Sequence, residues 1–180
     1  MTARQGLRVV LVIFLVVVLQ STLALDLRLG GAHPNVVYLL AIAAGLVAGP
    51  DQGAVVGFAA GLALDLLLPT PFGLSALVAS VVGFGVGTLG SRESAEGAEQ
   101  EGWRAVVVAL FASAGAVIMY AVVGAILGQG QFLHASLAVI MVVVALVNAV
   151  LAVPAVRLIR WALDQPTRRS LLYGAGRSRW

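Results

Sequence analysis

Apolar residues run along this chain in long blocks that short polar stretches interrupt. A helix needs about 20 residues to cross the hydrocarbon core of a bilayer, with a range of roughly 17 to 25. Because most of the blocks approach or exceed that length, the pattern predicts an all-α, polytopic integral membrane protein with about six transmembrane helices. The predicted spans cover residues 7–25, 35–48, 53–68, 72–90, 104–127 and 132–162.

Proline and glycine mark the boundaries between the middle spans. Residues 49–52 read Gly-Pro-Asp-Gln, which is typical of a turn because proline presets its own backbone and aspartate accepts local backbone hydrogen bonds. Leu68 precedes Pro69 and is biased away from helix, whereas Thr70 followed by Pro71 is typical of an N-cap and a first helical position. The sequence therefore predicts a tight helical hairpin and then a short turn before the fourth span.

Three of the predicted spans admit another interpretation. The runs 35–48 and 53–68 are short for full crossings, so they could instead form a re-entrant pair, which would leave the orientation of the flanking spans unchanged. Residues 7–24 imitate a signal peptide, with arginines before an apolar core and Thr-Leu-Ala at its end. A retained first span is favoured because the apolar stretch approaches full bilayer length.

Composition places the chain in lipid. It is 61% hydrophobic and 11% charged over 180 residues, which leaves too little polar surface to cover a soluble globule of that size. Cysteine is absent, which excludes a disulfide framework and a thiolate metal site. The positive charges are all arginines, and in so apolar a chain they report orientation first, not binding to nucleic acid.

The arginine positions predict the orientation. With six spans, every arginine except Arg28 falls on the side that holds both termini, and the positive-inside rule makes that side cytoplasmic. Trp103 and Trp161 fall at the same interface, where indole rings concentrate. We therefore expect a membrane domain over residues 1–163 and a basic cytoplasmic tail over residues 164–180, whose arginines could hold it on anionic membrane lipid.

One acidic residue lies inside apolar sequence. Gly57, Gly61 and Asp65 follow one another at steps of four residues, so they lie close to one stripe of a helix. Charged groups in membrane segments are costly and persist mainly where they face protein or water. We expect Asp65 to face a packed neighbour near the outer end of its helix, where it either ties down the Pro-Thr-Pro turn or contributes to an outward-facing site. Its candidate partners are Arg28, His33, His134, the Thr70 hydroxyl and the backbone amides that open the fourth helix.

Glycines and one asparagine supply further packing signals. Gly45, Gly49, Gly53, Gly57 and Gly61 recur every fourth residue, and small residues at that spacing let helix backbones approach closely in lipid. They either pack the hairpin internally, which is the favoured interpretation, or form a face that binds another protein. Asn148, in the middle of the last span, is expected to act as a structural amide that bonds across helices.

Sequence motifs for chemistry are lacking. The chain shows no nucleophile elbow, paired-histidine zinc helix, phosphate loop or close pair of catalytic acids. The two histidines stand alone, without carboxylates at ligand spacing. The sequence therefore predicts a protein that is not an enzyme and that holds neither a metal nor a cofactor.

One region resembles a known family. Pro34-Asn35 opens the second span, glycines from Gly53 to Gly61 lead into Leu64-Asp65-Leu66-Leu67, and the next turn ends in Pro71-Phe72-Gly73. This pattern, over about residues 34–80, resembles the rod shape-determining protein MreD family. Asn35 stands where that family commonly has aspartate, so this chain carries no charge at that position. The candidate structural or interaction residues are Asp65, Gly57, Gly61, Pro69, Pro71, Gly73, Asn35 and Arg28.

The resemblance implies a function and partners. Proteins of this family belong to the bacterial cell-elongation machinery in the inner membrane and are not enzymes. They bind the bitopic protein MreC and, directly or through it, the lateral-wall synthase formed by RodA and a penicillin-binding transpeptidase, coordinated with MreB filaments. The family is also similar in fold to the S-components of energy-coupling-factor transporters, so a vitamin-binding transporter subunit is the alternative.

Overall fold

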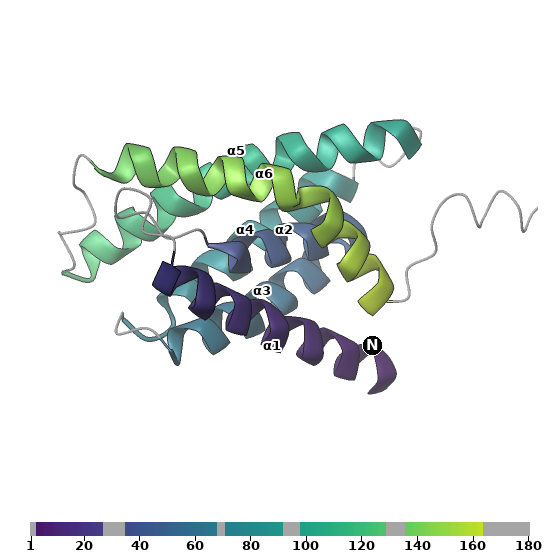
Figure 1. The fold of residues 1–180 in the computed structure, drawn as a ribbon, viewed down its shortest axis with the longest axis horizontal. Helices are drawn as coiled ribbons and strands as arrows, with labels where there is room; N and C mark the ends of the chain where they lie inside the picture. The colour runs from purple at the N-terminus through teal and green to yellow at the C-terminus, as the bar shows by residue number, and fades with distance from the viewer. Residues whose placement is uncertain (1–2, 27–34, 68–70, 92–97, 129–135, 164–180) are drawn as a thin grey trace, which may run out of the picture.

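The computed structural model describes residues 3–26, 35–67, 71–91, 98–128 and 136–163, and within these residues the chain is all-helical (Figure 1). This confirms the all-α part of the predicted fold class. The described residues form six helices, each overlapping one predicted span: α1 (Ala3–Asp26), α2 (Val36–Ala48), α3 (Pro50–Asp65), α4 (Leu74–Ser91), α5 (Ala98–Ile126) and α6 (Ser136–Ala162).

Three helices, α1, α3 and α5, begin earlier than the apolar pattern indicates, and α1 starts at Ala3, four residues before its predicted span. α3 starts at Pro50, because proline at the first helical position needs no hydrogen-bond acceptor for its nitrogen. α5 starts at Ala98, within a glutamate-rich stretch that precedes the predicted span 104–127. Glutamate, glutamine and alanine are strong helix formers in water, so the helix extends beyond the apolar run.

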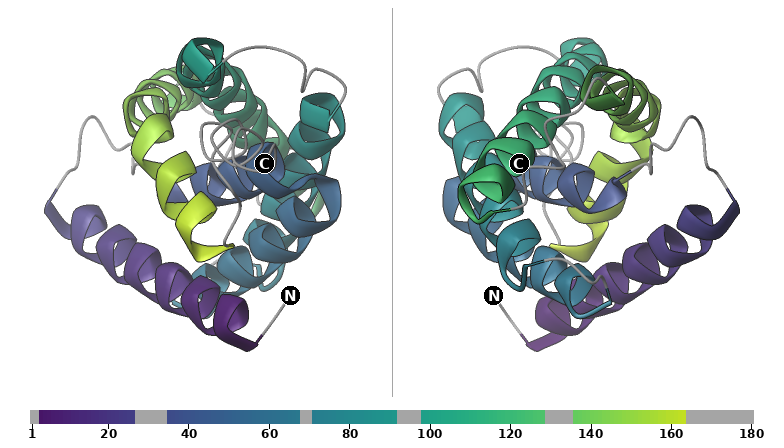
Figure 2. Two further views of the ribbon diagram at one scale, coloured as in Figure 1. Left: turned by 90° about the vertical axis from the view of Figure 1, so that its right-hand side faces the viewer. Right: turned by 90° about the vertical axis from the view of Figure 1, so that its left-hand side faces the viewer.

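α2 lies at the centre of the bundle. Residues Val36 to Gly45 are all buried, and α2 contacts each of the other helices (Figure 2). A helix that is apolar on every side is stable only when neighbours surround it in this way or when it lies in lipid. With 13 residues α2 is about 20 Å long, whereas α5 and α6 have 29 and 27 residues. The core is therefore built around a short helix, and longer helices flank it.

The glycines of α3 bring its backbone against α4. A Cβ atom on Gly61 would lie 2.5 Å from the Cα atom of Ala76, and one on Gly57 would lie 2.8 Å from the carbonyl carbon of Ala79. A Cβ atom on Gly53 would lie 2.7 Å from the carbonyl carbon of Gly83 on α4 and 2.8 Å from the Cα atom of Gly45 on α2. The glycine stripe therefore packs the chain internally. The alternative that this face binds another protein was wrong, because α4 already occupies it.

Lipid-compatible side chains cover the outside of the bundle. Large apolar residues are exposed on α1, α3, α4, α5 and α6, among them Phe14, Phe58, Phe84, Phe111 and Val150. Three stretches are long and apolar enough to cross a membrane, namely Ala3–Gln20, Gly102–Ile126 and Leu137–Ala162, while α2 and most of α4 are shorter apolar helices. α6 contains Pro154 and changes direction along its length (Figure 1), as expected of a proline within a helix.

Candidate functional site

The described core holds five buried polar side chains: Gln20, Asp65, Ser75, Ser113 and Asn148. They come from five different helices. The Ser75 hydroxyl has no hydrogen-bond partner among the described residues. The hydrogen bonds of the other four side chains lead to two places, the N-terminus of α2 and the N-terminus of α4. The first turn of a helix has backbone N–H groups without partners in the helix, and in lipid these groups must find partners within the protein.

Asp65 caps α4 from the neighbouring helix. Its Oδ2 accepts hydrogen bonds from the backbone N–H groups of Gly73 at 3.0 Å and Ala76 at 3.1 Å, and its Oδ1 accepts one from Ser75 at 3.2 Å. The side chain is 3% exposed. A carboxylate at this position also interacts favourably with the positive end of the helix dipole. Asp65 therefore fastens the end of α3 to the start of α4.

The turn residues complete that cap. The Leu74 N–H donates to the Pro71 carbonyl oxygen at 3.1 Å, and the Leu77 N–H closes the first helical turn on the Gly73 carbonyl oxygen at 2.9 Å. Gly73 adopts a φ of 92°, which favours glycine because other residues clash there. With the three amides bound by Asp65, every N–H group at this helix start has an acceptor.

The N-terminus of α2 is capped by side chains from α1 and from its own N-cap residue. The Val36 N–H donates to Gln20 Oε1 at 2.9 Å, and the Val37 N–H donates to Asn35 Oδ1 at 3.2 Å. Asn35 has an extended backbone, as N-cap residues do. An uncharged cap is sufficient here, which gives a physical reason why asparagine serves at position 35.

Asn148 joins this cap to α5 and α6. Its Nδ2 donates to the Asn35 carbonyl oxygen at 3.2 Å and to Ser113 Oγ at 2.8 Å. Both Asn148 and Ser113 are fully buried. Asn148 lies near the middle of α6, so the start of α2 lies beside the middle of α6. The cross-helix bond expected of Asn148 is therefore present.

We expect Asn148→Ala to lower the free energy of unfolding by about 1 to 3 kcal/mol, because it leaves buried acceptors without a donor. Ser113→Ala should cost less, since the Asn35 contact survives. A double-mutant cycle measured by unfolding in detergent should give a coupling of about 0.6 to 1.7 kcal/mol, the range found for hydrogen bonds between membrane helices. Strictly additive effects of the two substitutions would show that the 2.8 Å contact contributes nothing.

The structure brings together only part of the predicted site. Asp65, Pro71 and Gly73 meet at the start of α4, with Gly57 and Gly61 behind them in the α3–α4 contact, while Asn35 lies at the start of α2. Of the partners expected for Asp65, the described residues show the backbone amides of α4. Other predicted residues lie outside the described part of the chain: Arg28, Pro69, His33, Thr70 and His134.

Sequence reasoning missed two members of the site. Gln20 is a polar residue inside the first apolar run, a signal of the same kind as Asp65. Ser113 gave no such signal, because a serine inside a membrane helix is common and can bond to its own backbone.

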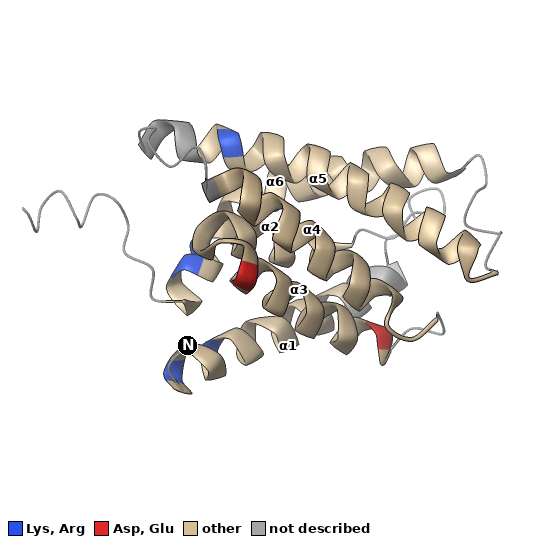
Figure 3. Cartoon of the chain, turned by 180° about the vertical axis from the view of Figure 1, so that it is seen from behind, with Lys and Arg blue, Asp and Glu red and all other residues tan. Residues whose placement is uncertain are grey.

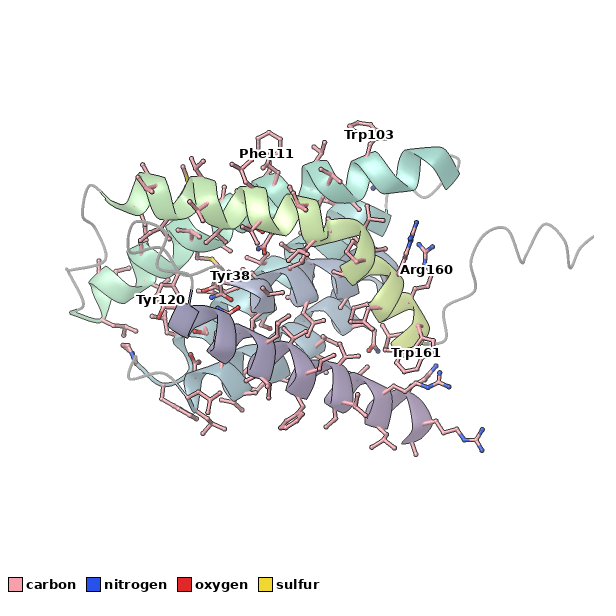
Figure 4. The ribbon with its side chains drawn as sticks, viewed as in Figure 1. Tyr38, Trp103, Phe111, Tyr120, Arg160 and Trp161 are labelled. Atoms are coloured by element: carbon pink, nitrogen blue, oxygen red, sulfur yellow. The ribbon has the colours of Figure 1, made fainter. Side chains whose placement is uncertain are left out.

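The chemistry of the site is hydrogen bonding to helix ends. No group of three or more His, Cys, Asp or Glu side chains that could hold a metal occurs within the described ranges. Tyr38 and Tyr120 lie toward the end of the bundle opposite Arg160 and Trp161 (Figure 4), in the apolar cluster that α2, α4 and α5 share. The buried polar side chains of Gln20, Asp65 and Asn148 therefore serve to hold helix ends in position.

The protein has long apolar helices and an apolar exterior, and its buried polar side chains form hydrogen bonds with helix ends. These features define a helical membrane protein whose buried polar groups have a structural role. The family model for the rod shape-determining protein MreD matches residues 3–163. The chain therefore belongs to the MreD family, which confirms the resemblance seen in the sequence. This is a family of shape-determining membrane proteins and is not a known enzyme family. Neither the curated proteins nor the solved structures gave a match.

Proposed function

We propose that the protein is a non-enzymatic scaffold of the cell-elongation machinery in the inner membrane of a rod-shaped bacterium. The observation that carries this proposal is the family match over residues 3–163. The site supports it, because the buried polar groups bond to helix ends in the same chain. A rigid bundle of this kind suits a protein that holds partners in position.

The proposed partners are a bitopic MreC-like protein and, directly or through it, the RodA and penicillin-binding transpeptidase pair. Exposed apolar helix surfaces support an encounter within the membrane, since a single transmembrane helix could pack on any of them. Because the α3 glycine stripe is occupied by α4, the partner surface belongs on other faces of the bundle. The similarity in fold to the S-components of energy-coupling-factor transporters stays a prediction. The alternative function that follows from it, a vitamin-binding transporter subunit, also stays a prediction.

We further propose six membrane crossings with both termini in the cytoplasm and a basic tail over residues 164–180. Figure 3 supports this orientation, because the described arginines gather at the end where α1 begins and α6 ends. The turn after Asp65 lies at the opposite end. The positive-inside rule supports a cytoplasmic position for the arginine end, and with it a position toward the outer face for the capped start of α4.

Depletion of the protein in its rod-shaped host is expected to round the cells, and a tagged copy should restore the rod and copurify with MreC in mild detergent. Gly61→Leu, which opposes the α3–α4 packing, should fail in both assays, while the exposed-site variant Asp51→Asn should behave as wild type. Normal rods after depletion, together with unchanged synthase complexes, would contradict the proposed function.

A further inference from the structure

α1 begins beside the end of α6. The Gln5 side chain donates from Nε2 to the Leu163 carbonyl oxygen at 2.9 Å, and Arg8 donates from Nη1 to the Trp161 carbonyl oxygen at 3.3 Å. The Arg8 guanidinium also lies over the indole ring of Trp161, with its Cζ atom 5.1 Å from the ring centroid. These contacts join the two helix ends into one surface, which we call the α1–α6 junction.

Positive charge gathers around this junction. Arg4 precedes Arg8 by four residues, and Arg157 precedes Trp161 by four, so each pair shares one helix face. The contact between Arg8 and Trp161 places the two faces side by side. Arg4 and Arg157 are both exposed. The junction therefore combines the Arg8–Trp161 contact with two exposed arginines, Arg4 and Arg157, each one helical turn away along its own helix.

Negative charge is lacking on the same two helices. Residues 136–162 of α6 contain no Asp or Glu, and the single acid of α1 is Asp26 at its opposite end. An external anion is therefore the complement that the sequence of these two helices does not itself supply.

The position of the junction relative to a bilayer identifies the kind of anion. Trp161 is 55% exposed and Trp103, on α5 at the same end in Figure 4, is 58% exposed. Exposed indole rings at a helix end concentrate at the level of lipid headgroups. Arg157 lies one helical turn before Trp161, and an arginine at that depth extends its side chain toward the interface, where lipid phosphates lie. Guanidinium groups bind phosphate in a planar, bidentate geometry.

We propose that the α1–α6 junction is a binding site for the phosphate headgroup of an anionic phospholipid, held by Arg4, Arg8 and Arg157 with Trp161 beside it. The site goes beyond the proposed scaffold function and does not depend on any protein partner. It requires only that this end of the bundle lies at a membrane interface. A lipid held there would bridge the first and last helices, adding to the contacts of Gln5 and Arg8.

The test uses the fluorescence of Trp161 as a local probe. The other two tryptophans are replaced, as Trp103→Phe and Trp180→Phe, in the full-length protein reconstituted into nanodiscs. Phosphatidylglycerol or phosphatidylcholine with brominated acyl chains is then added at equal fractions, since bromine quenches a nearby indole. At about 1 kcal/mol per arginine, brominated phosphatidylglycerol should be enriched at Trp161 by about fivefold or more over brominated phosphatidylcholine.

Matched variants separate a site from a general charge effect. Arg4→Gln with Arg157→Gln should lower the ratio of the two lipids at least several-fold, to the value that Arg8 alone supports, and Arg157→Gln alone should give an intermediate ratio. Arg104→Gln makes the same change of charge on α5, where the guanidinium donates to the Gly90 carbonyl oxygen at 3.4 Å, and should keep the wild-type ratio. Circular dichroism during heating checks that each variant is folded.

Two outcomes would overturn the proposal. Equal quenching of the wild-type protein by both lipids would show that no anionic lipid is selected at the junction. An equal loss of selectivity in Arg104→Gln and in the double variant would show that total charge attracts the lipid, without a site between α1 and α6.

Discussion

Replacing Asp65 with alanine is expected to lower the free energy of unfolding by about 3 kcal/mol or more and to reduce the amount of inserted protein. Three backbone N–H groups at the start of α4 donate to this carboxylate, at 3.0, 3.1 and 3.2 Å. Alanine would leave them without acceptors in a buried site. Hydrogen bonds to a charged group contribute about 1.5 to 3 kcal/mol each, and the loss of an N-cap alone costs about 0.5 to 2 kcal/mol.

Asp65→Asn should be less severe. Its amide keeps one acceptor oxygen but turns an NH₂ group toward N–H donors, so we expect a folded protein with intermediate stability and impaired restoration of cell shape. Asp51→Asn is the matched control, because Asp51 is exposed in the first turn of α3 and interacts only weakly with the helix dipole. Thermal unfolding in detergent ranks the variants. If Asp65→Ala melted at the wild-type temperature, the capping role of this carboxylate would be wrong.

Gly61→Leu is expected to prevent normal assembly of α3 and α4. Even the Cβ atom of a new side chain would lie 2.5 Å from Ala76 Cα, 2.6 Å from Ala76 N and 2.6 Å from the Ser75 carbonyl oxygen. These are backbone atoms of a neighbouring helix, so no side-chain rotation relieves the clash. Overpacking a core costs about 1 to 3 kcal/mol, and occasionally more. Because the α4 start also carries the Asp65 cap, displacement of α4 should disturb both features together.

A glycine on the outside of the bundle provides the control. A Cβ atom on Gly115 of α5 meets no atom within 4 Å, so Gly115→Leu should leave the yield of inserted protein close to wild type. Gly61→Ala tests the contact with the smallest possible side chain and should already lower the yield. Equal yields from Gly61→Leu and Gly115→Leu would mean that α3 and α4 do not approach as closely as the structure shows.

Much of the fold was predictable because helix formation in apolar segments depends on local sequence. Each apolar run became a helix, and Asn35 in front of the second run became its N-cap. Local patterns also marked the turns, since Gly49 adopts a φ of 85° next to Pro50 and Gly73 adopts a φ of 92°. The glutamate-rich start of α5 was the exception, because a polar sequence with high helix propensity continues a helix outside the apolar run.

The candidate site was predictable only in part. Asp65 could be selected from the sequence because a charged residue in an apolar helix is costly and persists mainly where it has a structural or functional role. Its actual partners lie 8, 10 and 11 residues further along the chain, in the turn before α4 and in the first turn of α4. The sequence left open whether this carboxylate faced a turn, a ligand or another protein, because that choice depends on how α3 and α4 cross.

By itself, the sequence determined that the protein is an all-helical membrane protein, where its helices lie and, through the segment around Asp65, that it belongs to the MreD family. These features follow from local chemistry, namely hydrophobic length and turn residues. Only the tertiary structure decided that α2 is the central helix, that the α3 glycines face α4, and that Gln20 and Asn148 meet at the start of α2. The physical reason is that a helix that is apolar on every side has no sequence pattern that distinguishes its contact face from its lipid face. The positions of small residues and of buried hydrogen bonds therefore determine which faces pack together.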